Sequence, residues 1–382
     1  MKRQRVGYRA KGTFWPYTPH HITVLQLTIT ILISMEYFLG ILFHSIGGFS
    51  SASFYVPTYK IKKWQWQTYW ITLGFVAWMI MPTIGGWITT SGLFDILSDV
   101  SFGTKFLTYF YGVLWGFGGL MAGLGIRYLG LALGQSICLG VCVILGTIVP
   151  AAMDHKLGLL FNTTAGLIIL FGFLICLVGI IFCGYAGVLK ERNATTVERN
   201  VSVKEFSATR GLIMAIAGGV MSSFMALAIN AGSPIAAQAL ESGTSKVFVN
   251  IPIFVLALAG GFTTNFIYAL ILMVKKKTIS DFRLKDPVLM TNNFLLSALA
   301  GIMWYCQYFF YGMGATKMGQ YDFASWTLHL ATIIIFSNLW GIYLKEWEHI
   351  NPKTKRCLWS GIILLIVSVV LIGIGNKIGG RL

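Results

Sequence analysis

One skeleton of glycines and tryptophan occurs twice, in GVLWGFGGLMAGLGIRYLG (112–130) and in GIMWYCQYFFYGMGATKMG (301–319). Four glycines and the tryptophan recur in one order, each 189 residues from its match: Gly112, Trp115, Gly123, Gly125 and Gly130 pair with Gly301, Trp304, Gly312, Gly314 and Gly319. A second echo, 171 residues apart, pairs Gly47, Gly48 and Ser51 with Gly218, Gly219 and Ser222. Because glycine is common, at 43 of 382 residues, the shared order carries more weight than any single match. The chain is interpreted as a duplicated unit, which is typical of membrane transporters.

Composition places the chain in a membrane. Hydrophobic residues make up 56% of the chain and charged residues 11%, and the mean hydropathy is +0.72. A soluble domain carries about 25% charged residues. Apolar runs near the length that crosses a bilayer occur at 37–57, 68–90, 105–126, 128–150, 164–189, 211–231, 247–274, 288–315, 323–344 and 357–375. The sequence therefore predicts an all-α integral membrane protein with ten transmembrane helices.

The net charge of +16 is distributed unevenly between the two sides of this body. Alternate connections, beginning with the one after the first helix, hold 18 Lys or Arg, whereas the other connections and the C-terminal tail hold six. Basic residues favour the cytoplasmic side, so both ends of the ten-helix body are predicted to face outward. Because the basic residues lie in alternate connections, they are interpreted as facing a lipid bilayer and not as binding a nucleic acid.

The duplication predicts how the chain is divided. Five crossings form an odd number, so two five-helix halves insert in opposite directions and form an inverted repeat with its site near the midplane. Residues 35–190 form the first repeat, 191–210 a cytoplasmic linker and 211–382 the second repeat. Residues 1–34 carry five basic residues on the outward side, against the charge bias. We expect this segment to be dispensable or an over-long gene start, with Met35 as the natural start.

Polar and aromatic residues recur on single faces of the predicted helices, where hydrocarbon makes polar groups costly. Sugar rings pack their C–H faces on aromatic side chains, and their hydroxyls require polar partners fixed in direction. A sugar is therefore the predicted substrate, and its candidate contacts are Trp304, Gln307, Tyr311, Trp326, Ser325, Trp115, Asn230, Asn265 and Tyr55. In the alternative interpretation, aromatic residues near helix ends form interfacial belts and small residues only permit close packing.

Few titratable residues lie within the predicted helices. Asp322 and His329 fall on one helical face, about 10 Å apart, with Ser325 between them. A desolvated carboxylate and imidazole titrate within reach of physiological pH, so this pair is the proton-coupling candidate and His44 is the next. Alternatively, Asp322 caps its helix and His329 is hydrogen-bonded in the bundle. Arg127 and Glu346 are interpreted as gate or structural charges, with Glu346 pairing with Lys345 or Arg127. Asp154 is interpreted as a solvated carboxylate in an outer loop.

No metal-ligand spacing, nucleophile motif or phosphate-binding loop is present, so no metal or cofactor is predicted and the proton is the expected coupling ion. Two other classes of function stay open. A membrane-embedded enzyme needs paired catalytic groups at one depth, for which Asp322 and His329 alone are thin support. A sugar sensor usually carries a soluble output domain. The oligomeric state is left open.

Several motifs then carry a resemblance: SASFYVPTYKIKKWQW (51–66), LWGFGGLMAGLGIRYLG (114–130), GTIVP (146–150), LKER (189–192), GIMWYCQYFFYGMGATKMGQYDFASWTLH (301–329) and LKEW (344–347). They are similar, in order, to the L-rhamnose–proton symporter family of the drug/metabolite transporter superfamily. The resemblance runs from about residue 39 to the C-terminus. It implies ten helices, an inverted repeat and proton-driven uptake of L-rhamnose or a similar 6-deoxyhexose across the bacterial inner membrane.

Positions that match the family's pattern are His44, Tyr55, Trp115, Arg127, Asn265, Asn293, Trp304, Gln307, Tyr311, Tyr321, Asp322, Ser325, Trp326, His329 and Glu346. One stretch departs from it. The family places Asn and Tyr after the Trp-Gly-x-Gly at 115–118, whereas this chain has Gly119-Leu120-Met121-Ala122. The exact sugar is therefore open, and a metabolite exporter of the same superfamily is the competing expectation.

Overall fold

The computed structural model describes residues 19–193, 207–348 and 350–380. In those ranges it is helical, without a β-strand, and ten helical segments are long and apolar enough to cross a membrane. The prediction of an all-α protein with ten transmembrane helices is confirmed. The ten spans are Met35–Thr58, Trp66–Thr89, Phe102–Leu129, Leu131–Met153, Thr164–Arg192, Ala208–Glu241, Lys246–Lys275, Pro287–Ala315, Gly319–Tyr343 and Pro352–Gly379.

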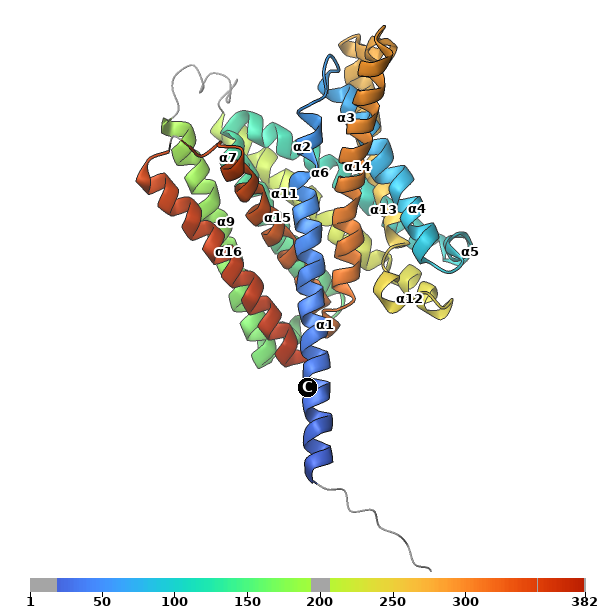
Figure 1. Cartoon of the computed structure of the whole chain (residues 1–382), viewed down its shortest axis with the longest axis vertical. Coiled ribbons are helices and arrows are strands. Elements are labelled where there is room, and N and C mark those ends of the chain that lie inside the picture. Colours follow the sequence, from blue (N-terminus) through green and yellow to red (C-terminus); the bar gives the residue numbers. More distant parts are fainter. Residues whose placement is uncertain (1–18, 194–206, 349, 381–382) are drawn as a thin grey trace, which may run out of the picture.

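Several spans are built from more than one element (Figure 1). The elements of the first half are α1 (Pro19–Ser53), α2 (Tyr55–Thr58), α3 (Trp66–Phe75), η1 (Val76–Ile80), α4 (Met81–Thr89), α5 (Leu93–Asp99), α6 (Phe102–Leu129), α7 (Leu131–Met153), α8 (Leu157–Asn162) and α9 (Thr164–Asn193). Those of the second half are α11 (Ala208–Ala231), α12 (Ser233–Glu241), η2 (Lys246–Phe248), α13 (Ile253–Lys275), η3 (Thr278–Arg283), α14 (Pro287–Ala315), η4 (Gly319–Ala324), α15 (Ser325–Tyr343) and α16 (Pro352–Gly379).

The proposed N-terminal extension falls partly outside the described residues, which begin at residue 19. Helix α1 starts at Pro19 and continues through Met35 into the first span without a break. No turn therefore separates the residues before Met35 from the first transmembrane helix, over the part of α1 that begins at Pro19. Whether residues 1–34 are dispensable stays a prediction. The expected linker 191–210 also lies largely outside the described residues.

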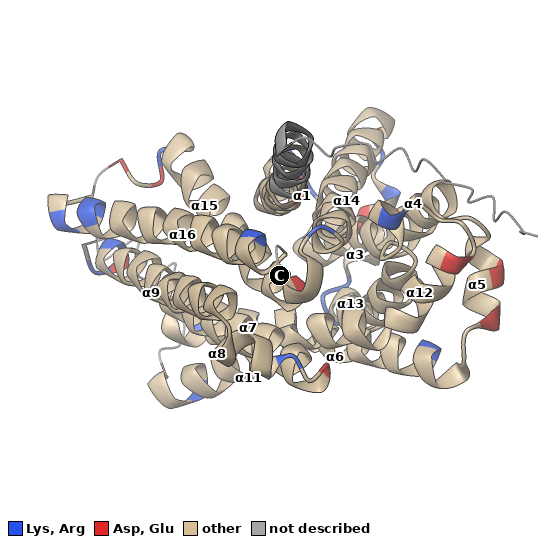
Figure 2. Cartoon of the chain, turned by 90° about the horizontal axis from the view of Figure 1, so that it is seen from below, with Lys and Arg blue, Asp and Glu red and all other residues tan. Residues whose placement is uncertain are grey.

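Helix contacts follow one pattern in both halves (Figure 1). The first span packs on the eighth and ninth, α1 on α14 and α15, while the sixth packs on the third and fourth, α11 on α6 and α7. The fifth and tenth spans, α9 and α16, lie side by side in both views (Figures 1 and 2). The contacts of the first span with the eighth and ninth thus have counterparts in those of the sixth with the third and fourth.

The matched glycines lie at matching helix crossings. A Cβ on Gly112 of α6 would meet the backbone of Ala257 in α13, and a Cβ on Gly301 of α14 would meet the carbonyl of Leu73 in α3 at 2.7 Å. The last matched pair lies in the connections that follow α6 and α14: Gly130 has φ +88° between α6 and α7, and Gly319, the first residue of η4, has φ +57°. A side chain is strained at such φ values, so both turns favour glycine.

Charged residues gather at helix ends and connections, and the helix bodies are free of them over most of their length (Figure 2). Helix α15 is the most buried crossing, with two thirds of its spanning window inside the bundle. It carries the polar residues Ser325 and His329 into the core, where both are almost completely buried. The centre of the bundle therefore holds polar groups that the surrounding protein, and not lipid, encloses.

Candidate substrate cavity

A cavity of about 510 Å³ opens at the end of the bundle where α12 and the C-terminal end of α16 lie. Its volume is within the range of about 300–1,000 Å³ that is usual for small-molecule sites. Both halves of the chain contribute, through the ends of α7, α11 and α14 and the turns around η2 and η4. The polar lining comes from Asp154, Lys156, Asn230, Lys246, Asn250 and Asp322, and the apolar lining includes Gly146, Pro150, Ala226, Ile253 and Tyr311.

A chain of polar contacts crosses the mouth of this cavity. The Lys156 ammonium lies 2.7 Å from Oδ1 of Asp322 and 3.5 Å from Oδ2 of Asp154. The side-chain amide of Asn230 donates to Oδ1 of Asp154 at 2.7 Å. The contacts join the α7–α8 connection to η4 and to α11. Asp154 is exposed, as expected of a solvated carboxylate, but its carboxylate is also shared between a cation and an amide.

Lys156 keeps its charge at physiological pH. Partial burial alone would lower the pKa of its ammonium, but the hydrogen bond and charge of Asp322, with the charge of Asp154, raise the pKa above its usual 10.5. A raised pKa means that the ammonium is charged below pH 10.5, and its contribution to the ion pair is lost only as the pH rises through the raised pKa. Any change in this network between about pH 5 and 9 must therefore come from groups other than the ammonium.

Local backbone structure places Lys156 at this point. Helix α7 ends in a Schellman turn, in which His155 has a left-handed φ of +56° and donates its N–H to the carbonyl of Ala152. The N–H of Lys156 bonds to the carbonyl of Ala151 at 2.7 Å. These bonds satisfy carbonyls at the end of the helix and turn the chain sharply. The cation is thus mounted on a rigid helix end and not on a loose loop.

The wall of the cavity contains a backbone acceptor. Pro150 lies inside α7 and has no N–H, so the carbonyl of Gly146 lacks its usual helical donor. Both residues line the cavity. Gly146 also permits a close approach, because a Cβ there would overlap the indole of Trp326. The GTIVP motif therefore combines a carbonyl that lacks its helical donor, that of Gly146, with room for the indole of Trp326.

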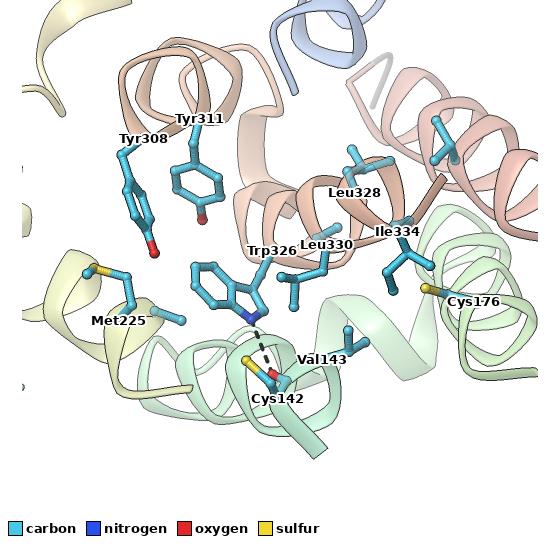
Figure 3. Packing of buried hydrophobic residues seen from close by; sticks show 14 of the residues in the cluster. Cys142, Val143, Cys176, Met225, Tyr308, Tyr311, Trp326, Leu328, Leu330 and Ile334 are labelled. Atoms are coloured by element: carbon cyan, nitrogen blue, oxygen red, sulfur yellow. Dashed lines mark hydrogen bonds between the residues drawn. The ribbon is translucent and has the colours of Figure 1, made fainter. Parts of the chain in front are cut away.

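Aromatic rings form the floor (Figure 3). Tyr308 and Tyr311 project from α14 toward Trp326, whose indole N–H donates to the carbonyl of Cys142 at 3.2 Å. Tyr311 lines the cavity, and its ring meets Trp326 edge-on at 5.8 Å between centroids. This arrangement offers an apolar surface below a polar rim, which suits a ligand with both C–H faces and hydroxyls.

Two buried histidines lie beneath Tyr311. The rings of His44 in α1 and His329 in α15 are 6.2 Å apart, and each is 5.3 Å from the Tyr311 ring. None of the four imidazole nitrogens makes a hydrogen bond within the described residues. The nearby carbonyl of His44 accepts from the hydroxyl of Thr332 instead. Unpaired buried polar groups are costly, so packing alone does not account for the two imidazoles in this cluster.

A second aromatic group lies deeper in the bundle. Trp304 is eleven residues from the C-terminal end of α14, or about 16 Å, whereas Tyr311 is about 6 Å from it. The Trp304 ring is 5.2 Å from that of Trp78 and 5.7 Å from that of Trp115. Trp78 lies in the π-helical turn η1, and π-turns often mark functional positions. This cluster separates the cavity from the other side of the bundle.

Comparison with known proteins agrees with this architecture. Residues 33–378 match the family described as L-rhamnose-proton symport protein. The chain belongs to this family. A relative from Yersinia pestis (strain Pestoides F), named L-rhamnose-proton symporter, is 34% identical over 341 residues, which cover 88% of this chain and 97% of the relative. One of the same name from Escherichia coli (strain 55989 / EAEC) is 35% identical with the same coverage.

Membership of the symport family confirms the resemblance drawn from the sequence motifs and the prediction of a transporter and not an enzyme. It does not by itself assign residues. Of the candidate sugar contacts, the structure places Tyr311 and Asn230 in the cavity lining and Trp326 directly behind Tyr311. Of the candidate proton-coupling residues, Asp322 is at the mouth and the two histidines are below the floor.

Other candidates of this symport-family chain lie elsewhere. Asn265 accepts the indole N–H of Trp70 at 3.2 Å and donates to the carbonyl of Gly261, so it ties α13 to α3. Tyr55 lies half-exposed at the opposite end of the bundle, in contact with Phe54. Four further candidates do not line the cavity: Trp115 and Trp304 in the deep cluster, buried Gln307, and buried Ser325, whose hydroxyl has no partner within the described residues.

Two sequence predictions concern pairs of titratable residues: Arg127 with Glu346, and Asp322 with His329. Arg127 lies in the last turn of α6 and Glu346 in the turn after α15, and no direct contact between them is found among the described residues. Asp322 belongs to the 3₁₀ turn η4, where Tyr321 has non-helical angles, and α15 begins only at Ser325. The pair Asp322 and His329 therefore does not share one straight α-helix.

Sequence reasoning missed Lys156 and Trp78. In the sequence, Lys156 is only one basic residue of an outer connection. Its spacing of two residues from Asp154 is a weak signal, because its main partner Asp322 is 166 residues away. Trp78 has no polar neighbours on its helix to distinguish it from an ordinary buried aromatic residue.

Proposed function

We propose that this chain imports L-rhamnose together with protons across the bacterial inner membrane, by alternating access. The observation that carries the proposal is the family match over residues 33–378, with relatives named L-rhamnose-proton symporter. The cavity supports it independently, since it has the size of a small-molecule site and combines an aromatic floor with a polar rim.

The structure is proposed to represent an outward-facing state. The cavity opens at the end of the bundle that carries few basic residues, and the basic connections lie at the other end. Under the positive-inside rule, the open end faces the periplasm, and so do both ends of the ten-helix body. The deep cluster around Trp304 would then be part of the closed inner side.

An inverted five-helix repeat is proposed to supply the second state. Its support is the exchange of contacts between halves, in which α1–α14 corresponds to α11–α6 and α3–α14 to α13–α6. In such a body, rocking of one half against the other exposes a central site alternately to the two sides. Protons are proposed to act through Asp322 at the mouth and the His44–His329 pair below it.

Uptake of labelled L-rhamnose into proteoliposomes tests this proposal. With an inward proton gradient, the sugar should accumulate above its external concentration, and a protonophore should abolish the accumulation but leave exchange of labelled for unlabelled sugar. Addition of L-rhamnose should also make the external medium more alkaline. If the gradient instead drives release of a loaded metabolite and L-rhamnose moves no protons, the chain would be an exporter.

A further inference from the structure

Lys156 lies between two carboxylates that belong to different parts of the cavity mouth. Its ammonium is closer to Asp322, at 2.7 Å, than to Asp154, at 3.5 Å. Oδ1 of Asp322 accepts from Lys156 and also from the N–H of Phe323 at 2.9 Å. Within the described residues Oδ2 of Asp322 has no such contact. The cation therefore engages one oxygen of Asp322 and has an alternative partner already in place.

We propose that Lys156 couples proton binding to sugar binding, by holding Asp322 while its carboxylate is charged and moving to Asp154 when that carboxylate is protonated. The proposal rests on the proposed function, because it names the residue that links the two substrates of the same cavity. Lys156 is a positioning residue in this scheme, since it acts on the sugar site through Asp322.

Protonation of Asp322 changes a single covalent bond. A proton from the outer solvent forms an O–H bond on Oδ2 of Asp322, and no other covalent bond changes. The charge attraction between Asp322 and Lys156 is then lost, while Asp154 still holds the ammonium, which keeps its own proton throughout. The released carboxylic acid offers one donor and acceptor positions to a sugar hydroxyl. Before protonation the ammonium occupies the acceptor Oδ1, and the carboxylate has no donor of its own, so the charged state binds sugar weakly.

The coupling role requires a cation that is ion-paired with carboxylates in the cavity. Lys156 meets this requirement, and the neighbouring Lys246 does not. Lys246 lines the same cavity but forms no ion pair among the described residues. Lys317 is held by Glu36 at 3.0 Å. The half-exposed partners, with side-chain exposures of 25% for Lys156 and 45% for Asp322, allow both protons and sugar to reach the pair. Such an exposed pair adds little to stability, so its place in the cavity is better explained by function.

Other charged or titratable groups surround Asp322 on every element that packs against η4. Besides Lys156 and Asp154 after α7, they are Lys246 across the cavity, Tyr311 in α14, His329 in α15 and Lys377 in the last turn of α16. Only Lys156 makes an ion pair with Asp322 within the described residues. A change at Lys156 should therefore dominate the pH dependence at this carboxylate.

The test is L-rhamnose affinity of the purified full-length protein measured as a function of pH and followed by tryptophan fluorescence. Wild-type affinity should fall as the pH rises. In Lys156→Gln, the fall should occur at higher pH by about one unit, because a cation favours the charged form of a carboxylate beside it. Binding should then be about twofold tighter at the wild-type midpoint and approach about tenfold tighter two units above it. In Asp154→Asn, which removes the cation's alternative partner and keeps an acceptor for Asn230, the midpoint should move to lower pH.

The controls separate charge from structure. Lys156→Arg keeps the cation and should keep the wild-type profile, and Lys246→Gln removes an equal charge from the same cavity and should leave the midpoint nearly unchanged. A Lys156→Gln profile with the wild-type midpoint, or weaker binding at every pH, would overturn the proposal. If Lys156→Gln does not fold, Asp154→Asn provides the test: a midpoint at lower pH supports the proposal, and an unchanged midpoint overturns it. Wild-type protein that binds no L-rhamnose at any pH would instead overturn the proposed function.

Discussion

At the scale of single residues, Asp322 stands where the cavity meets the solvent, on the turn that leads into the most buried helix. Its Oδ1 contacts Lys156 and the N–H of Phe323, and Tyr311 separates it from the two histidines below. A proton that enters at the mouth would therefore reach a carboxylate first and the imidazoles only after passing the aromatic floor.

We expect Asp322→Asn to abolish uphill accumulation of L-rhamnose and to leave exchange across the membrane partly intact. The amide does not titrate, so the sugar can bind and move but no longer carries a proton with it. Accumulation under a proton gradient and exchange without one are measured in the same proteoliposomes, with Asp322→Glu as the variant that keeps a carboxylate. Accumulation by Asp322→Asn above the external concentration would place coupling elsewhere, with His44 as the next candidate.

The paired histidines lead to a second expectation. Because their rings are neighbours and all four nitrogens lack partners among the described residues, they should act as one unit. Sugar-driven proton flux should fall by a similar factor in His44→Gln, in His329→Gln and in the double variant. Groups that act together show such non-additive effects. Fully additive losses in the double variant would mean that the two rings have separate roles.

Trp304→Ala tests the deep aromatic cluster. In the structure Trp304 packs on Trp78 and Trp115 and does not line the cavity. If its ring contacts the sugar in another state of the cycle, the variant should lose about 1–3 kcal/mol of sugar binding. Titration of the purified variant, with Trp66→Ala at the far end of the bundle as control, measures this loss. Unchanged affinity would return Trp304 to a packing role.

At the scale of helices, glycines allow the close crossings that bring the two halves together. Gly112 in α6 faces the backbone of α13, and the matched Gly301 in α14 faces that of α3. Backbone atoms cannot move aside as the end of a side chain can, so these contacts should tolerate no added carbon. Gly123 of the same skeleton has open space beside it, because no neighbouring side chain or helix lies within 4 Å of where its Cβ would be.

We therefore expect Gly112→Ala and Gly301→Ala to lower the melting temperature in detergent, and Gly123→Ala to leave it unchanged or slightly higher. Overpacking of a tight crossing costs about 1–3 kcal/mol. Alanine in place of an exposed helical glycine gains up to about 1 kcal/mol. Thermal melts of the three variants provide the measurement, with Gly123→Ala as the matched control on α6. Equal melting temperatures for Gly112→Ala and Gly123→Ala would contradict the crossing geometry.

At the scale of the whole molecule, the open cavity and the basic connections lie at opposite ends of the bundle. The protein therefore presents a ligand-sized opening on one side and positive charge on the other. This polarity connects the fold to the direction of transport, since an importer must first receive its sugar from the outer side.

Cysteine labelling in right-side-out vesicles tests that orientation. Thr316→Cys in the cavity lining should react with a membrane-impermeant maleimide, and L-rhamnose should slow the reaction. Lys62→Cys, in the connection between α2 and α3, should react only after the membrane is permeabilised. Background should be low, because five native cysteines are buried and Cys306 is partly buried. The reverse pattern would show that the cavity opens to the cytoplasm.

The sequence by itself determined the ten crossings, the matched glycine skeleton and the family. These properties depend on hydropathy summed along each segment and on residue order, and neither requires knowledge of which helices touch. It also identified Asp322, His329 and His44 as the unusual titratable groups, because charges and imidazoles inside hydrocarbon are rare whatever their neighbours.

Only the tertiary structure decided which of these groups meet. Lys156 joins Asp322, 166 residues away, and His44 joins His329 through the packing of α1 on α15. Asn265, a candidate sugar contact, is occupied by Trp70, and Asp322 leaves the helix of His329 at the turn near Tyr321. Helical spacing places residues on one face of one helix, but the partner of that face depends on how helices rotate and cross, which is set by close packing between distant segments.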